Sequence, residues 1–131
     1  MILEEVLKHS TYQISNVLYS VAKVDNTCNF ENCFLVTRDE LETTVIYRQD
    51  QHLNGIIEEK KDYVLIGINV AVPFYAPGFI ATISSSFAKQ AISVLVVSTY
   101  SRDYFLVSGR YSDLAVTILE RLGIKRLTKE V

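Results

Sequence analysis

Residues 73–107 read PFYAPGFIATISSSFAKQAISVLVVSTYSRDYFLV and set out one helix and two strands in close succession. Apolar side chains in this run recur at the spacing of a helix with one buried face, which predicts an amphipathic helix from Gly78 to Ala91. A buried strand is expected next, over Ile92 to Ser98, followed by a turn and a partner strand over Tyr104 to Val107. This order places the start of the helix beside the polar end of a strand.

The residues on either side of this run complete a recognisable order of elements. Tyr63 to Val72 is apolar enough for a strand in the middle of a sheet. A second helix is expected over Ser112 to Leu122, capped by Ser112 and stopped by Gly123, with a last strand over Ile124 to Thr128. The second half of the chain therefore reads β-α-β-β-α-β, which is the order of the split βαβ, ferredoxin-like motif.

The first half of the chain predicts strands and very little helix. One short helix is expected over Ile2 to Lys8. Three strands are expected after it: Val17 to Val24, Cys33 to Arg38 and Thr43 to Arg48. Residues 50–62 are polar and charged, and they predict an exposed connection that is partly helical around Ile56 and Ile57. We therefore expect two domains, over residues 1–61 and residues 62–131, and an α+β fold overall.

The composition excludes several classes of function. The chain has 131 residues, of which 49% are apolar, and its 13 basic and 15 acidic side chains give a net charge of -2. A nucleic-acid binder should instead show a basic patch or stripe. The longest apolar stretches are shorter than the roughly 20 residues of a membrane-spanning helix. The opening residues, MILEEVLKHS, lack the pattern of a signal peptide, so we expect a cytoplasmic protein that binds neither nucleic acid nor membrane.

The residues that most often perform catalysis or bind metals are few and scattered. Cys28 and Cys33 are expected to be free thiols, because no secretory signal accompanies them. His9 and His52 lie far from them in sequence and complete no metal-ligand spacing. The run Ser84-Ser85-Ser86 is interpreted as a polar helix face, because a serine nucleophile needs an oriented base beside it. We expect no enzyme activity, no metal and no cofactor.

Two positions could hold a charged ligand, and each also has an ordinary structural explanation. No side chain before Gly78 can cap the helix, so its free backbone N–H groups could donate hydrogen bonds to a ligand carboxylate. Alternatively, Pro77 simply opens the helix and water serves these amides. Asp103 could bind an ammonium or guanidinium group, or it could be an ordinary acidic residue in a turn.

The motifs in this region resemble those of ACT domains, the small regulatory modules that sense amino acids. Family members typically carry an Asp-x-Pro-Gly turn before the first helix, and this chain reads Tyr75-Ala76-Pro77-Gly78, with a tyrosine in place of the acid. The stretch STYSRDYFLV over residues 98–107 and the stretch FLVTRDEL over residues 34–41 look like one branch of the family. That branch contains small bacterial proteins with paired ACT-like units, akin to the ligand-binding modules of the animal cytosolic arginine sensor.

The resemblance implies a fold, a function and a site. The fold is the ferredoxin-like βαββαβ ACT fold over residues 62–131, an antiparallel sheet with helices on one face, preceded by a strand-rich abbreviated ACT-like unit. The function is non-catalytic regulation by a small ligand, an amino acid, held between two ACT-like units. The residues carried over as ligand-binding are Gly78, Phe79, Ile80, Thr99, Tyr100 and Asp103.

Two expectations concern the partners of such a protein. A homodimer is expected, because exposed sheet edges of this kind often pair between subunits. The alternative function is a structural or protein-interaction module that binds no metabolite. The residues that separate the two functions are Gly78, Thr99 and Asp103, which only a ligand-binding protein needs for binding.

Overall fold

The computed structural model describes residues 2–72 and 74–127, and the chain forms two compact units. Unit 1 consists of Met1–Asn16 and Val64–Val131. Unit 2 consists of Val17–Tyr63 and is therefore inserted between the two segments of unit 1. Within the described residues, no helix has the length and apolar character needed to cross a membrane.

This division differs from the two domains expected from the sequence, residues 1–61 and 62–131. The N-terminal segment joins unit 1 because strand β1 (Thr11–Ile14) pairs antiparallel with the second half of strand β5 (Ile56–Asn69). In this register Thr11 lies opposite Asn69 and Ile14 lies opposite Ile66. The sequence analysis did not predict β1, because its four residues are too few for their alternation to stand out.

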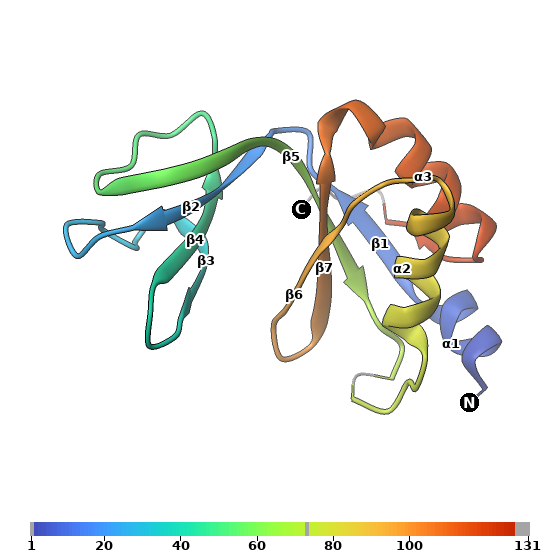
Figure 1. The fold of residues 1–131 in the computed structure, drawn as a ribbon. Coiled ribbons are helices and arrows are strands. Elements are labelled where there is room, and N and C mark those ends of the chain that lie inside the picture. Colours follow the sequence, from blue (N-terminus) through green and yellow to red (C-terminus); the bar gives the residue numbers. More distant parts are fainter. Residues whose placement is uncertain (1, 73, 128–131) are drawn as a thin grey trace. The chain divides into compact units, whose positions relative to one another are not determined.

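Unit 1 is a mixed α+β structure in which helices pack on one face of a sheet (Figure 1). Besides β1 and the second half of β5, its elements are α1 (Leu3–His9), α2 (Phe79–Lys89), β6 (Leu95–Ser98), β7 (Arg102–Ser108), the 3-10 turn η1 (Gly109–Tyr111), α3 (Ser112–Arg121) and β8 (Lys125–Arg126). The strands lie in the order β6-β7-β5-β1-β8. The β6–β7 and β5–β1 pairs are antiparallel, and the short β1–β8 pair is parallel.

The core of unit 1 forms where the apolar face of helix α2 packs on the apolar face of strand β5. Ile83 and Phe87 lie one helical turn apart on α2 and are fully buried. Ile66 and Ile68 lie two residues apart on β5 and face the same core. The ring of Phe87 stacks on Phe105 of β7, with the ring centroids 6.4 Å apart. The predicted helix over residues 78–91 and the β-α-β-β-α-β order are confirmed.

Unit 2 is an antiparallel sheet, and none of its residues is helical. It contains β2 (Tyr19–Val24), β3 (Cys33–Arg38), β4 (Thr43–Arg48) and the first half of β5, in the order β3-β4-β2-β5. A small apolar cluster holds it together, with Ala22, Val24, Val45 and Tyr47 at its centre. The three strands predicted for this part of the sequence are confirmed.

The expectation of an exposed, partly helical connection over residues 50–62 is wrong for its second half. Residues 56–62 belong to β5, where Glu58 lies opposite Lys23 and Glu59 lies opposite Ala22. The sequence gives little sign of this strand because most of its charged side chains are exposed and it pairs with β2, which no local pattern indicates. Long-range pairing has overridden the local composition.

Two predictions at element ends also need correction. Arg102 and Asp103 do not lie in the turn, because they open β7, and the turn is closed by the Thr99 N–H donating to the Arg102 carbonyl at 3.0 Å. Ser112 does not cap α3: the cap residue is Tyr111, which makes no side-chain cap bond, because η1 leads directly into the helix. The last strand ends at Arg126, and Thr128 lies outside the described residues.

Candidate functional site

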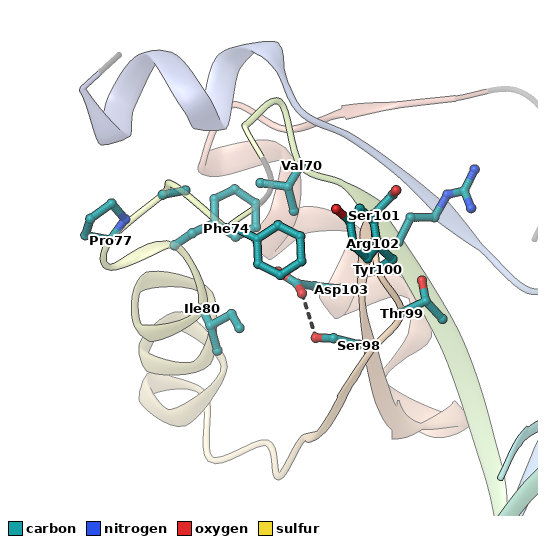
Figure 2. Close-up of a pocket in the computed structure, with 12 residues that line it drawn as sticks. Val70, Phe74, Pro77, Ile80, Ser98, Thr99, Tyr100, Ser101, Arg102 and Asp103 are labelled. Carbon is teal, nitrogen blue, oxygen red and sulfur yellow. Dashed lines mark hydrogen bonds between the residues drawn. The ribbon is translucent and has the colours of Figure 1, made fainter. Parts of the chain in front are cut away.

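A pocket of about 330 Å³ opens in unit 1 between the start of α2 and the β6–β7 hairpin (Figure 2). One wall comes from the loop after β5 and the first turn of α2, and the other comes from the hairpin turn. All lining residues belong to unit 1: Val70, Phe74, Ala76, Pro77, Phe79, Ile80, Ser98, Thr99, Tyr100, Ser101, Arg102 and Asp103. Two segments that lie about twenty residues apart in sequence thus form one hollow.

The structure places five of the six carried-over residues in the lining of this pocket, namely Phe79, Ile80, Thr99, Tyr100 and Asp103. The sixth, Gly78, is not part of the lining. It is the N-cap residue of α2 and has a left-handed backbone conformation, with φ at 83°. Glycine adopts this conformation without steric cost, so Gly78 turns the chain into the helix. A Cβ atom at this position would face Leu3 of α1 at 3.5 Å.

The start of α2 leaves backbone donors near the pocket. Within the described residues, no side chain caps this helix and its first turn contains no acidic residue. The Phe79 N–H donates to the Ala76 carbonyl at 3.1 Å, and the first full helical bond runs from the Thr82 N–H to the Gly78 carbonyl at 2.9 Å. The amides of Ile80 and Ala81 therefore have no acceptor within the helix, and they lie at its positive end.

Asp103 brings a carboxylate into the pocket, and a cross-strand bond fixes its position. Ser98 and Asp103 lie opposite each other in the β6–β7 pair. The Ser98 hydroxyl donates to Oδ1 of Asp103 at 2.7 Å, as the dashed line in Figure 2 shows. No other described side chain bonds to this carboxylate, so its remaining lone pairs can accept further donors.

Arg102 lines the same pocket, but its guanidinium group is held elsewhere. Its Nε donates to Oδ1 of Asn69 at 2.7 Å, and Nδ2 of Asn69 donates to the Thr11 hydroxyl at 3.2 Å. Figure 2 shows the side chain extending away from the pocket centre. Asp103 is therefore the ionised side chain that the lining directs inward.

Two exposed aromatic rings frame the pocket. Phe74 and Tyr100 meet edge to face, with ring centroids 5.1 Å apart, although 73% and 83% of their surfaces remain exposed. The sequence analysis did not assign Phe74 to the site, nor Val70, Ala76, Pro77, Ser98, Ser101 and Arg102. These residues are close in sequence to the assigned ones, which is the only sign the sequence offers. Closeness in sequence does not show which side chains face the pocket.

The histidines and cysteines do not gather at this pocket. His9 and His52 are exposed and are not among its lining residues. Among the described residues, no three His, Cys, Asp or Glu side chains are placed to hold a metal ion together. Cys28 and Cys33 are free thiols in unit 2, and burial, followed by the nearby Cys28 thiol, raises the pKa of Cys33 to about 11.

Part of the chain matches a known protein family. Residues 58–121 match the family model described as the ACT domain. The chain contains an ACT domain. The matched residues run from β5 through α3, so this domain includes the entire lining of the pocket. No curated protein matches the chain in sequence.

Solved structures agree with this chain over almost its whole length at low identity. A protein from Agobacterium tumefaciens has a TM-score of 0.75 at 17% identity, covering 93% of this chain and 95% of its own. A Vibrio cholerae protein of unknown function, described as a possible transport protein, scores 0.74 at 18% identity, covering 92% and 95%. The ligand-free regulatory subunit of aspartate kinase from Thermus thermophilus scores 0.61 at 7% identity, covering 85% and 95%. These likenesses show that the fold is shared.

Proposed function

We propose that this protein is a non-catalytic regulatory protein that binds an amino acid in the pocket of its ACT domain. The observation that carries the proposal is the pocket itself, which combines an inward-facing carboxylate with the uncapped start of a helix. An α-amino acid carries one ammonium and one carboxylate. Asp103 suits the first group and the amides at the start of α2 suit the second.

The proposal extends to a homodimer. Strand β6 pairs only with β7 among the described strands, so its outer edge is open. Leu95 and Val96 on this strand remain 42% and 38% exposed. An open edge with apolar side chains invites pairing with another chain. A second copy at this edge would lie near Ser98 and the pocket, so ligand binding and assembly would influence each other.

Regulation would arise if the ligand binds one arrangement of the protein more tightly than another. The fold of the ACT domain and its likeness to an aspartate kinase regulatory subunit support a regulatory role. Unit 2, over Val17–Tyr63, would then take the role of the abbreviated N-terminal ACT-like unit that was expected over residues 1–61. Its β2, β3 and β4 lie outside the residues that match the family model.

A second candidate function is a protein-interaction module that binds no metabolite. Three strongly exposed aromatic side chains near the pocket favour it: Phe74, Tyr75 and Tyr100, of which Tyr75 is 78% exposed. Monomeric proteins rarely expose such a group without a partner. The two functions differ in whether any amino acid stabilises the folded protein.

Thermal unfolding with each of the twenty standard amino acids tests the proposed function. A ligand present at about 100 times its dissociation constant stabilises the folded state by about 2.7 kcal/mol. We expect a rise in melting temperature with at least one amino acid, and its loss in Asp103→Asn. Asp113→Asn is the matched control, because Asp113 is an exposed aspartate on α3 outside the pocket.

The outcome separates the two candidates. A rise that survives in Asp103→Asn would remove Asp103 from the site. The absence of a rise with every amino acid would contradict the proposal and favour the interaction module.

A further inference from the structure

We infer that the pocket selects an amino acid whose side chain is uncharged and apolar; this inference rests on the proposed function and narrows it to a ligand class. Two features of the lining carry it. One is the number of charged groups directed into the pocket, and the other is the chemistry of the remaining walls.

The charged groups of the pocket match a ligand with one cation and one anion. Asp103 supplies a single carboxylate, fixed by the Ser98 hydroxyl at 2.7 Å. Arg102 supplies no inward charge, because its Nε is bonded to Asn69 and its side chain extends away (Figure 2). The positive contribution is the start of α2, which is partial and diffuse. The backbone ammonium and carboxylate of an amino acid use both groups.

A charged side chain on the ligand would find no partner in the lining. Lysine or arginine would bring a second cation, and the pocket has one inward carboxylate, Asp103. Aspartate or glutamate would bring a second anion, and the guanidinium group of Arg102, whose Nε is bonded to Asn69, extends away from the pocket centre (Figure 2). A charge that leaves water without a partner is strongly unfavourable. Charged side chains are therefore selected against.

The remaining walls suit an apolar side chain. Val70, Phe74, Ala76 and Ile80 line one side, and the ring of Tyr100 lies on the other, in contact with Phe74. The described lining includes no Asn, Gln, His or Lys side chain. Of the hydroxyls in the lining, that of Ser98 is bonded to Asp103, and those of Thr99, Tyr100 and Ser101 lie on the hairpin turn at one end of the pocket. Apolar contact is thus the main interaction offered to a ligand side chain.

We assign the preference for an apolar ligand side chain to Phe74 and Tyr100. They come from two different segments, the loop before α2 and the β6–β7 turn, and they touch each other across the pocket. Phe74 is held in the left-handed region, with φ at 69°, which is unusual for a bulky side chain. A ligand side chain seated between these walls would contact both rings and replace part of their exposure to water.

Calorimetric titration of the full chain with leucine, phenylalanine, lysine, aspartate and glycine tests the inference. We expect leucine or phenylalanine to bind at least about tenfold more tightly than lysine, aspartate and glycine, a difference of about 1.4 kcal/mol. Phe74→Ala should weaken that binding about tenfold. Tyr75→Ala is the matched control, because Tyr75 is an equally exposed ring of the same loop that does not line the pocket.

The possible results are distinct. Tightest binding by lysine or aspartate would overturn the apolar class while leaving the proposed function standing. Equal binding of glycine and leucine would overturn the role of the apolar walls. Equal losses in Phe74→Ala and Tyr75→Ala would overturn the assignment to Phe74. Binding of none of the five, together with no stabilisation by any other amino acid, would overturn the proposed function as well. Circular dichroism of each variant checks that it is folded.

Discussion

At the scale of single residues, the position of Asp103 shows how one backbone register can create a site. The sequence analysis expected Asp103 in a turn and, through the resemblance, named it as a candidate ligand-binding residue. The structure places it on β7 opposite Ser98, and the hydroxyl of that serine fixes the carboxylate. Because β7 begins at Arg102 rather than at the predicted Tyr104, Asp103 lies on the strand and lines the pocket.

Tyr47 illustrates a different use of a buried polar group, in unit 2. Its side chain is 4% exposed, and its hydroxyl donates to Oε2 of Glu59 at 2.6 Å. Burial, reinforced by the bond to Glu59, raises the pKa of this phenol from 10.0 to about 12. The neutral form is thus favoured in the folded state.

The raised pKa of Tyr47 predicts a pH dependence of stability. The folded state keeps the proton between pH 10 and about pH 12, whereas the unfolded state loses it. The stability contributed by Tyr47 is therefore complete below pH 10 and is lost as the pH rises through this window. We expect urea denaturation to show a smaller loss between pH 9 and pH 11.5 in Tyr47→Phe than in the unmodified protein.

The control for this prediction is Tyr75→Phe, which removes a hydroxyl from a strongly exposed side chain. It should leave the slope of stability against pH unchanged. Equal slopes in the unmodified protein and Tyr47→Phe would contradict the prediction. Tyr12, whose pKa is also raised to about 12 by burial and by Glu120, remains in both proteins and contributes equally.

At the scale of elements, α2 serves the core and the pocket at once. Its buried face anchors the helix to the sheet through Ile83 and Phe87, and its first residues line the pocket. The hairpin of β6 and β7 does the same on the opposite side, because Phe105 packs in the core while Asp103 faces the pocket. The core between α2 and β7, which includes the contact of Phe87 with Phe105, thus joins the elements that carry the two pocket walls.

This coupling predicts a large effect of Phe87→Ala. The side chain is fully buried and stacked on Phe105, so its removal leaves a cavity. We expect a loss of about 3–5 kcal/mol in the free energy of unfolding, measured by urea denaturation. Ser85→Ala changes an exposed position of the same helix and should alter stability by less than about 0.5 kcal/mol. A loss below about 1 kcal/mol in Phe87→Ala would contradict this packing.

At the scale of the whole molecule, the order of the chain differs from the order of its units. Unit 1 is built from segments on both sides of unit 2 in the sequence, since β1 pairs with the second half of β5. That pairing joins residues more than fifty positions apart. β8 then pairs with β1 and brings the last described strand beside the first.

The open edge of β6 gives a prediction about assembly. If two copies pair there, Leu95→Lys places two unpaired charges in the interface and should convert a dimer into a monomer. Light scattering coupled to size-exclusion chromatography measures this change. Leu41→Lys is the control, because Leu41 is 89% exposed on the β3–β4 turn of unit 2. A monomeric unmodified protein at all concentrations, or a Leu95→Lys dimer, would contradict this interface.

The sequence by itself determined the elements whose signal is local. Helix α2 follows from the repeat of Phe79, Ile83 and Phe87, because side chains about one turn apart share a face of the helix. Strands β3 and β4 begin and end at the predicted residues, since both are bounded by polar turn residues. The resemblance carried by residues 75–78 and 98–107 also pointed to segments that line the pocket.

Only the tertiary structure decided which distant segments meet. The place of β1 in unit 1 and the strand over residues 56–62 both depend on pairing partners that no local pattern names. The inward carboxylate of Asp103 and the outward guanidinium of Arg102 depend on strand register and on a bond to Asn69. The physical reason is that periodicity reports which face of a helix or strand is buried. A pocket depends on which other segment packs beside that helix or strand, and periodicity does not report this.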